Sequence, residues 1–316
     1  MFLKSLLIGI GSYLPRFSRL LRNAGTGGTI NARYCYSVWL RHLVVAAKNG
    51  LPTQPKSLLE IGPGNSLGVG LAALLTGSIK YFALDIFKFT EFKSNLTIFE
   101  ELVDLFKERA NIPDNKEFPM LKPDLDCYEF PGNILSDTRL DSSLDLSRLL
   151  TIKNLLLGID TGKETNIQIS YFAPWYDKRT LKEESIDLIL SQAVLEHVMD
   201  INAIYNNFYH WLKPNGFISH QIDLTSHNTA KAWNGHWTYS DFIWRLMKGK
   251  RPFLLNRCPY SVHIKAIQEA GFKIVNEIKN KEKNSLTYQK LASKFKTLNE
   301  VDLTTSGIFV QAIKNH

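Results

Sequence analysis

The chain has 316 residues, of which 44% are hydrophobic and 22% charged, so its composition is that of a globular protein and excludes a disordered or fibrous one. Thirty-eight Lys and Arg against 30 Asp and Glu leave a net charge of +8, which permits an acidic partner such as nucleic acid without indicating one. The three cysteines (Cys35, Cys127, Cys258) form no C-x-x-C pair, so we expect neither disulfides nor a Cys-based zinc module. A reducing compartment, the cytoplasm, fits best.

The first 14 residues are largely apolar, but the stretch is too short to span a bilayer and has no clear cleavage site for a signal peptidase. We expect an amphipathic helix that packs on the body of the protein. The alternative is weak contact with a membrane surface, because Leu6, Leu7 and Ile8 lie near Lys4, Arg16, Arg19 and Arg22.

A Gly-rich loop at 25–28 precedes a helix that we predict over 31–48. A short apolar run at 57–61 ends in glycines and reads as a buried parallel strand. A helix at 68–75 and a second strand at 81–84, closed by Asp85, complete a βαβ unit.

Residues 90–165 are less regular and are predicted to be an insertion, with helices at 96–110 and 144–157 around a Pro- and Asp-rich segment. Beyond it the pattern alternates again. We predict strands at 166–171, 185–190, 217–224, 272–278 and 308–313, helices at 201–212 and 261–270, and a turn at 213–216. Strands alternating with helices indicate an α/β fold with one doubly wound sheet.

The strongest signal for chemistry is LLEIGPG at 58–64, followed by Asp85. Gly62 and Gly64 let the backbone approach a ligand closely, and the helix beyond presents free N–H groups. A carboxylate at the position of Asp85 can accept both hydroxyl protons of a ribose, and Glu60 suits a ligand that carries an ammonium group. Two alternatives stay open: a tight turn without a ligand, and NAD binding, although the NAD fingerprint requires glycine where Leu67 stands.

Four blocks in this order resemble the class I S-adenosylmethionine-dependent methyltransferases. They are LLEIGPG at 58–64, YFALDI at 81–86, IDLILSQAVLEHV at 186–198 and WLKPNGFI at 211–218. The resemblance implies a Rossmann-like sheet of seven strands with an antiparallel last strand, and S-adenosylmethionine as cofactor. It divides the chain into an N-terminal helical segment or lid over 1–55 and a methyltransferase domain over 56–316 that carries the insertion.

Carried over position by position, the resemblance predicts which residues contact the cofactor. The methionine part would lie against the loop that holds Glu60, Gly62, Pro63, Gly64 and Ser66. Asp85 would hold the ribose, Ile86 and Ala173 would approach the adenine, and Ser191 and Gln192 would lie under the sulfonium. Ser66 stands where the family often has a third glycine, and no acidic residue occupies the usual adenine-reading position unless Asp177 reaches it.

Three residues are candidates for catalysis. Asp223 closes a predicted strand and His227 follows in the loop, so this pair could act as a general base and its orienting group. His197 follows Glu196 in an E-H pair; we expect Glu196 to cap or pair, and His197 to pack under the cofactor or to act beside the substrate. We predict no metal site, because Ala193 stands where some relatives have a further ligand.

Three further segments each keep two interpretations. The Trp- and Tyr-rich stretch 233–244 could stack on sugars or bases or simply cap the sheet, and Arg33 and Tyr34 could close over the cofactor or lie on a helix surface. The Lys-rich run 279–296 reads as a solvated connection or as a phosphate contact.

The sequence therefore predicts an S-adenosylmethionine-dependent methyltransferase that acts on an oxygen or nitrogen of a small-molecule, glycan or glycolipid acceptor. An RNA methyltransferase and a non-catalytic cofactor-binding protein are the alternatives.

Overall fold

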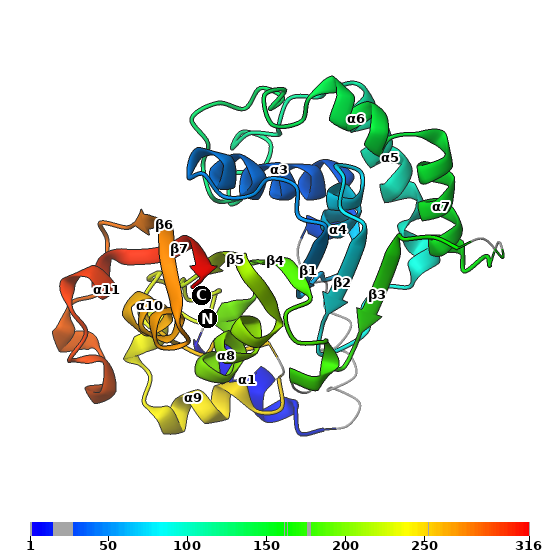
Figure 1. Cartoon of the computed structure of the whole chain (residues 1–316). Helices are drawn as coiled ribbons and strands as arrows, with labels where there is room; N and C mark the ends of the chain where they lie inside the picture. Colours follow the sequence, from blue (N-terminus) through cyan, green and yellow to red (C-terminus); the bar gives the residue numbers. More distant parts are fainter. Residues whose placement is uncertain are drawn as a thin grey trace.

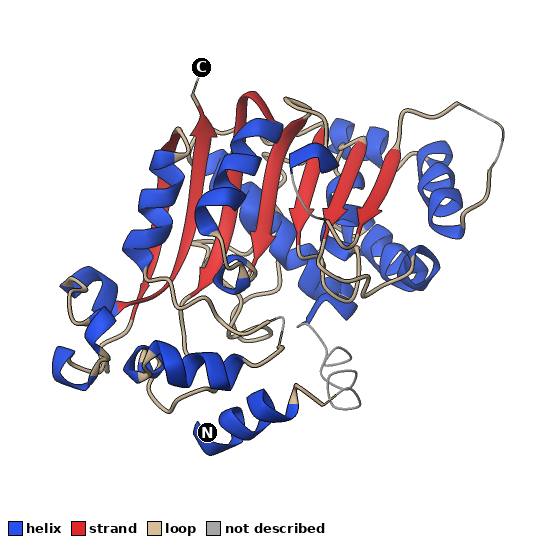
Figure 2. Ribbon diagram, turned by 90° about the horizontal axis from the view of Figure 1, so that it is seen from below, coloured by secondary structure: helices blue, strands red, loops and turns tan. Residues whose placement is uncertain are grey.

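The computed structural model describes residues 2–14, 28–160, 162, 164–175, 178–251 and 253–315. A seven-stranded sheet with the order β3-β2-β1-β4-β5-β7-β6 crosses the molecule (Figures 1 and 2). The first five strands are parallel, and β7 is antiparallel to both of its neighbours. This confirms the predicted doubly wound, Rossmann-like sheet with an antiparallel last strand.

The strands are β1 (Ser57–Ile61), β2 (Lys80–Leu84), β3 (Gln168–Phe172), β4 (Ile186–Gln192), β5 (Leu212–Asp223), β6 (Phe272–Lys281) and β7 (Thr305–Lys314). The helices are α1 (Phe2–Gly11), α3 (Ala32–Lys48), α4 (Gly68–Leu74), α5 (Leu96–Lys107), α6 (Asp137–Ser143), α7 (Leu146–Leu157), α8 (Ile201–Trp211), α9 (Asp241–Lys248), α10 (Tyr260–Glu269) and α11 (Glu300–Thr304). Short 3-10 turns join several of them.

Helices cover both faces of the sheet (Figures 1 and 2). Helices α3, α4 and α5 pack on one face, and α8 and α10 pack on the other. Successive residues of a strand point to opposite faces, so in β1 Leu58 joins the core beneath α4, while Leu59 and Ile61 join the core beneath α8. A buried parallel strand therefore needs apolar residues on both sides, which is the pattern from which it was predicted.

Two predicted boundaries are wrong for local reasons. The helix expected at 144–157 begins at Leu146, because the Asp145 side chain accepts hydrogen bonds from the N–H groups of Ser147 and Arg148 and so caps the N-terminus. The turn expected at 213–216 belongs to β5, which pairs with β4 already at Leu212 and then bulges before pairing resumes at Phe217.

Most lysines of the Lys-rich run 279–296 are exposed, as a solvated connection requires, but the connection also contains a small core. Between β6 and β7, Leu291, Phe295 and Leu303 pack around the buried Trp237 as a small separate core. The aromatic stretch that contains Trp237 thus serves packing at this edge of the molecule.

The segment that follows α5 is tied to the sheet layer by one buried cation. Arg41, on α3, is fully buried, and its guanidinium donates to the carbonyl oxygens of Pro113, Leu121 and Pro123 at 2.8–2.9 Å. On the same helix the exposed Arg33 forms a two-pronged ion pair with Glu117 at 2.7 Å. The two arginines bind the same segment, one in the interior and one at the surface.

Arg41→Ala is expected to lower the free energy of unfolding by about 3 kcal/mol or more, because several buried carbonyl oxygens lose their donor. The matched control Arg33→Ala is expected to cost about 1 kcal/mol or less, since exposed ion pairs contribute little. Urea unfolding measures both values, and limited proteolysis should cut Arg41→Ala alone within 112–125. Equal losses in the two variants would contradict this account.

Candidate functional site

The loop after β1 passes very close to the loop after β4. Gly62 has φ +68°, and a Cβ at this position would lie 2.7 Å from a methyl carbon of Val194. Its N–H donates to the carbonyl oxygen of Leu84 at the end of β2, at 2.8 Å. Gly64 also has a positive φ, +71°. The two glycines of the motif are thus required by backbone geometry, and the ends of β1, β2 and β4 meet at one point.

Asp85 lies directly beside this loop and is buried. Its carboxylate accepts a hydrogen bond from the N–H of Ile86 at 2.7 Å. Burial raises the pKa of Asp85 to about 6, although the backbone N–H groups of Ile86 and Gly64 oppose the rise. The side chains of Ile86 and Phe172 on either side of it are exposed and apolar. A carboxylate between exposed apolar side chains suits a sugar joined to a flat ring system.

Glu60 is directed away from the loop surface. Its carboxylate is buried and accepts a hydrogen bond from the Tyr81 hydroxyl at 2.5 Å, on the side of the sheet that α4 covers. Burial raises the pKa of Glu60 to about 7, while the bond from Tyr81 opposes the rise. The structure therefore gives Glu60 a partner beneath the loop, so its predicted contact with an ammonium group stays a prediction.

A short turn of the N-terminal segment lies on the same loop. The Thr29 hydroxyl accepts from the N–H of Asn65 at 3.0 Å, and the Ser66 hydroxyl donates to the Thr29 carbonyl oxygen. Ser66 also accepts from the N–H of Gly68 at 3.1 Å, and Pro63 is buried. The serine that replaces the family's third glycine thus fastens this turn to the loop. Residues 25–27 of the predicted Gly-rich segment lie outside the described residues.

The two residues expected to close over the cofactor have partners in the insertion. Arg33 pairs with Glu117, and the Tyr34 ring packs edge-to-face on Phe118 with centroids 5.5 Å apart. Burial raises the pKa of Tyr34 to about 12. Both side chains therefore hold α3 against residues 117–118 in this structure.

The residues predicted to contact the adenine and the sulfonium lie in different surroundings. Ala173 is next to Phe172, whose carbonyl oxygen accepts from the N–H of Asp85 at 3.0 Å, so Ala173 lies near Asp85 and its contact with the adenine stays a prediction. Ser191 is fully buried, and its hydroxyl is 2.9 Å from Nδ1 of the core residue His220. Gln192 is held between His42 and the carbonyl oxygen of Lys122. Asp177 lies outside the described residues.

Asp223 and His227 come together at the end of β5. Nε2 of His227 is 3.0 Å from Oδ2 of Asp223, although the N–H is not aligned on that oxygen as a hydrogen bond requires. The N–H of Thr225 donates to the other carboxylate oxygen at 2.9 Å. Burial raises the pKa of Asp223, but His227 and Thr225 outweigh it and hold the pKa below its ordinary value. Asp223 is therefore an ionised partner for the imidazole.

His197 connects this pair to the glycine loop. Its ring centroid is 5.3 Å from that of His227, and it lies three residues beyond Val194, which touches Gly62. Burial, together with the neighbouring His227, lowers the pKa of His197 to about 4, so its imidazole is neutral at pH 7. A continuous run of contacts therefore leads from Gly62 to His227.

The sequence did not predict the environment of Glu196. It is 2% exposed, and neither of its carboxylate oxygens has a hydrogen-bond partner in the described structure. It lines a small cavity with Asp223, His236 and Asn256. Burial first, and then the charge of Asp223, raises the pKa of Glu196 well above its ordinary value. The expectation that it caps or pairs is wrong, and only its place in the E-H dipeptide could have indicated a special role.

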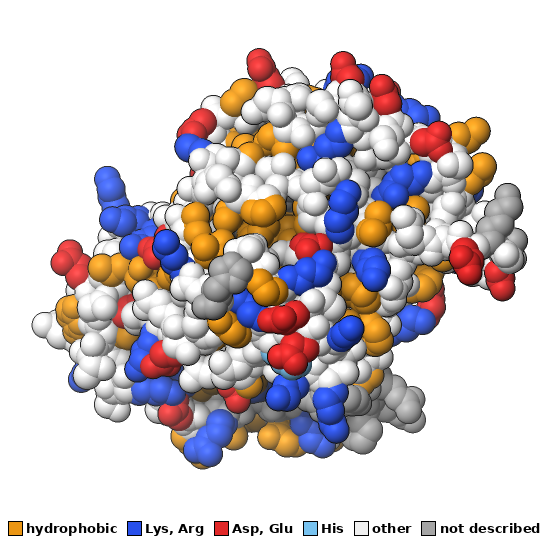
Figure 3. Space-filling view, viewed as in Figure 1, with side chains coloured by type: hydrophobic (Ala, Val, Ile, Leu, Met, Phe, Trp, Pro, Cys, Tyr) orange, Lys and Arg blue, Asp and Glu red, His pale blue; other side chains and the backbone are white. Residues whose placement is uncertain are grey.

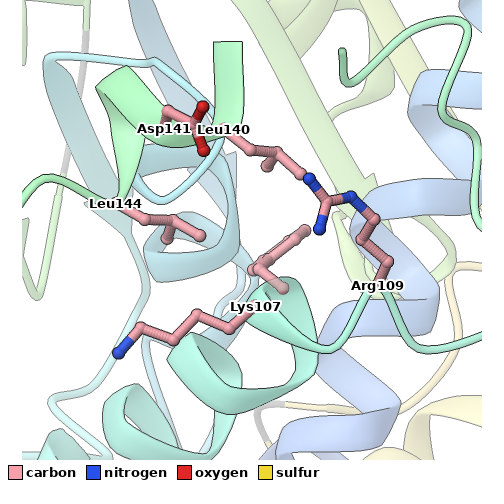
Figure 4. A pocket seen from close by; sticks show the side chains of 6 residues that line it. Lys107, Arg109, Leu140, Asp141 and Leu144 are labelled. Carbon is pink, nitrogen blue, oxygen red and sulfur yellow. The ribbon is translucent and has the colours of Figure 1, made fainter. Parts of the chain in front are cut away.

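Two other features of the described residues bear on function. No group of three His, Cys, Asp or Glu side chains among them could hold a metal ion. A wider hollow lies between α5 and α6, lined by Lys107, Arg109, Asp141 and three apolar residues (Figure 4). Helix α5 runs back from the end of β2, so this hollow is at the opposite edge of the sheet from Asp85 (Figure 1). The polar groups described above gather at the other edge.

Comparison with known families decides the class of activity. Residues 162–219, which contain β3, β4 and α8, match a family model described as a methyltransferase domain. This part of the chain is similar to a methyltransferase domain. This confirms the predicted S-adenosylmethionine-dependent methyltransferase, with S-adenosylmethionine as cofactor. The match covers less than a fifth of the chain and does not include the glycine loop.

Solved structures of similar fold are distant. An S-adenosylmethionine-dependent methyltransferase from Mesorhizobium loti is 14% identical, with 86% of this chain and 97% of that one covered and a TM-score of 0.40. Phosphoethanolamine N-methyltransferase 2 from Haemonchus contortus is 13% identical, with 88% and 53% covered and a TM-score of 0.41. A search of curated proteins found no match. Likenesses this distant say nothing of the acceptor.

The buried carboxyl of Glu196 predicts a pH-dependent stability. Since its pKa is higher in the folded than in the unfolded protein, folding takes up a proton once the pH exceeds about 4.5, and stability falls as the pH rises further. In Glu196→Gln this loss should be absent, so the variant should gain in melting temperature over the parent between pH 5 and 9. The exposed Glu108→Gln serves as control. Parallel curves for Glu196→Gln and the parent would show that the carboxyl is solvated or paired.

Proposed function

We propose that this methyltransferase acts on an oxygen or nitrogen of a small-molecule, glycan or glycolipid acceptor that binds beside Asp223 and His227. The observation that carries the proposal is the run of contacts from Gly62 through Val194 and His197 to His227, because it sets a carboxylate–imidazole pair next to the glycine loop. The three free cysteines support a reducing, cytoplasmic location.

The residues at the ends of β1 and β2 fit the cofactor. Gly62 has no room for a Cβ beside Val194, so its bare backbone is free to face a ligand, and Asp85 offers a buried carboxylate between the exposed apolar side chains of Ile86 and Phe172. In this proposal Asp85 holds the ribose hydroxyls, while the backbone of Gly62, Pro63 and Gly64 carries the methionine part. When bound, S-adenosylmethionine supplies an activated methyl group. The protein contributes mainly alignment of donor and acceptor.

The Asp223–His227 pair is the proposed base. A small rotation of the His227 ring would align Nε2–H on the Asp223 carboxylate, 3.0 Å away; Nδ1 then keeps its lone pair and can accept a proton from an acceptor hydroxyl or ammonium group. Asp223 stabilises the imidazolium that forms. His197, neutral and adjacent, adds no competing charge. Burial raises the pKa of Glu196 well above its ordinary value, which favours the neutral carboxyl and so limits the negative charge near Asp223.

Cofactor binding should depend on pH through Asp85. The ionised carboxylate accepts both ribose hydroxyl protons, and the pKa of this group is about 6, so affinity for S-adenosylhomocysteine should fall about tenfold between pH 7 and pH 5. Calorimetry at each pH measures it. Asp85→Asn should bind weakly and without this dependence. Glu60→Gln, which removes the other buried carboxyl nearby, should keep the pH dependence of affinity. If Glu60→Gln loses this dependence instead, Glu60 is the group that titrates.

Loss of the base should slow transfer without weakening cofactor binding. Asp223→Asn and His227→Ala are expected to lower the rate of transfer of labelled methyl groups to acceptors in a cell extract by about 10²–10⁴-fold. Affinity for S-adenosylhomocysteine should stay unchanged in both. His210→Ala is the matched control, because His210 also lies 3.3 Å from a carboxylate, that of Glu183, but on α8. An unaltered rate of methyl transfer in both site variants would show that Asp223 and His227 do not act as the base.

A further inference from the structure

Helix α1 makes its closest contacts with the protein through small residues, beside which Leu6 and Phe2 also pack. Ser5, Gly9 and Ser12 are buried against α9 and the residues that follow it. A Cβ at Gly9 would lie 2.1 Å from the carbonyl oxygen of Leu246, and the Ser12 hydroxyl accepts from the N–H of Lys250 at 2.7 Å. The two backbones are therefore too close for a larger side chain between them.

The opposite side of α1 presents a continuous apolar stripe. Leu3, Leu7, Ile10 and Leu14 are 65%, 61%, 52% and 64% exposed. Spacings of four and three residues place Leu3, Leu7 and Ile10 on one side of the helix, and Leu14 follows in the turn beyond its end at Gly11. A surface helix of a soluble protein usually buries such a stripe, and no side chain in the described part of the chain covers this one.

The charge around this stripe is mostly basic. Residues 2–14 and 241–251 contain five basic residues (Lys4, Arg245, Lys248, Lys250, Arg251) and one acidic residue, Asp241, which pairs with Arg257 and Lys294. Lys4, Arg245 and Lys250 are exposed. In Figure 3, apolar and basic side chains lie side by side along the lower edge, where Figure 1 places α9 and α1. Exposed leucines with flanking cations match the two parts of an anionic bilayer surface, its acyl chains and its head groups.

This surface lies on the same edge of the sheet as the candidate site. Figure 2 shows the N-terminal helix beyond the carboxyl ends of the parallel strands. In the segment after α9, Phe253 packs on Phe87 and Phe89, which follow Asp85, with ring centroids 6.1 and 5.7 Å apart. Helix α9 therefore connects the stripe on α1 to the residues around the proposed ribose site.

We propose that α1, together with the basic residues of α9 and those just after it, is a docking surface for an anionic membrane. Helix α1 lies in the interface with Leu3, Leu7, Ile10 and Leu14 among the acyl chains, and Arg245 and Lys250 meet the head groups. No helix among the described residues is long and apolar enough to span a bilayer, so the contact is peripheral. The proposal does not depend on methyl transfer.

The test is co-sedimentation of the full chain with vesicles of phosphatidylcholine alone or mixed with phosphatidylglycerol, without cofactor. The parent should bind the anionic vesicles, and more weakly as salt is raised. Leu7→Ser/Ile10→Ser should bind them at least about tenfold more weakly, because two aliphatic side chains no longer enter the acyl layer. Its melting temperature should equal that of the parent, since both side chains are exposed.

Two matched controls lie far from α1. Leu146→Ser replaces an equally exposed leucine, 70% accessible, at the start of α7, and Lys107→Glu removes a surface charge on α5. Both should bind vesicles as the parent does, whereas Arg245→Glu/Lys250→Glu should lose the preference for anionic lipid. Parent protein that ignores anionic vesicles, or Leu7→Ser/Ile10→Ser that binds like Leu146→Ser, would overturn the proposal. So would a lipid-free dimer of the parent that the α1 variant dissociates, because the stripe would then join two copies of this chain.

Discussion

The close contact between Gly62 and Val194 is the constraint on which the rest of the site depends. β1 lies between β2 and β4, and the chain leaves β1 toward the face that carries α4 but leaves β4 toward the face that carries α8. Loops that diverge in this way open a crevice at the carboxyl ends of the strands, where open α/β sheets bind ligands. The backbone at position 62 can pass Val194 only with a positive φ and no side chain.

Around this crevice the sheet departs from apolar packing. Glu60, Asp85 and Glu196 are buried carboxyls whose pKa values burial raises, each at or just beyond the end of a strand. Burying such groups lowers stability unless each finds a partner, and Glu196 has none among the described residues. Buried acids with raised pKa values near the ends of neighbouring strands are a sign of function.

The peripheral parts are attached by two different means. The segment after α5 is held by hydrogen bonds from the buried Arg41, which satisfy main-chain oxygens that would otherwise lack donors. Helix α1 is held by close backbone packing at Gly9 and at Ser12 just beyond its end, which leaves Leu3 and Leu7 exposed. The first arrangement fixes a loop to the core, and the second leaves an apolar surface exposed at the edge where the acceptor is proposed to bind.

By itself the sequence determined the alternation of strands and helices, the antiparallel last strand through family resemblance, and the glycines of the first loop. These follow from local periodicity and from backbone angles that only glycine adopts readily, so no distant contact is needed to read them. Contacts between distant segments decided the rest. The Glu60 carboxylate bonds to the Tyr81 hydroxyl, and the Ser191 hydroxyl lies beside the His220 ring. The Glu196 carboxyl has no partner among the described residues, and α1 makes its closest contacts through small residues. Which way a side chain points, and what it meets there, depends on neighbours far away in the chain, and no residue spacing encodes them.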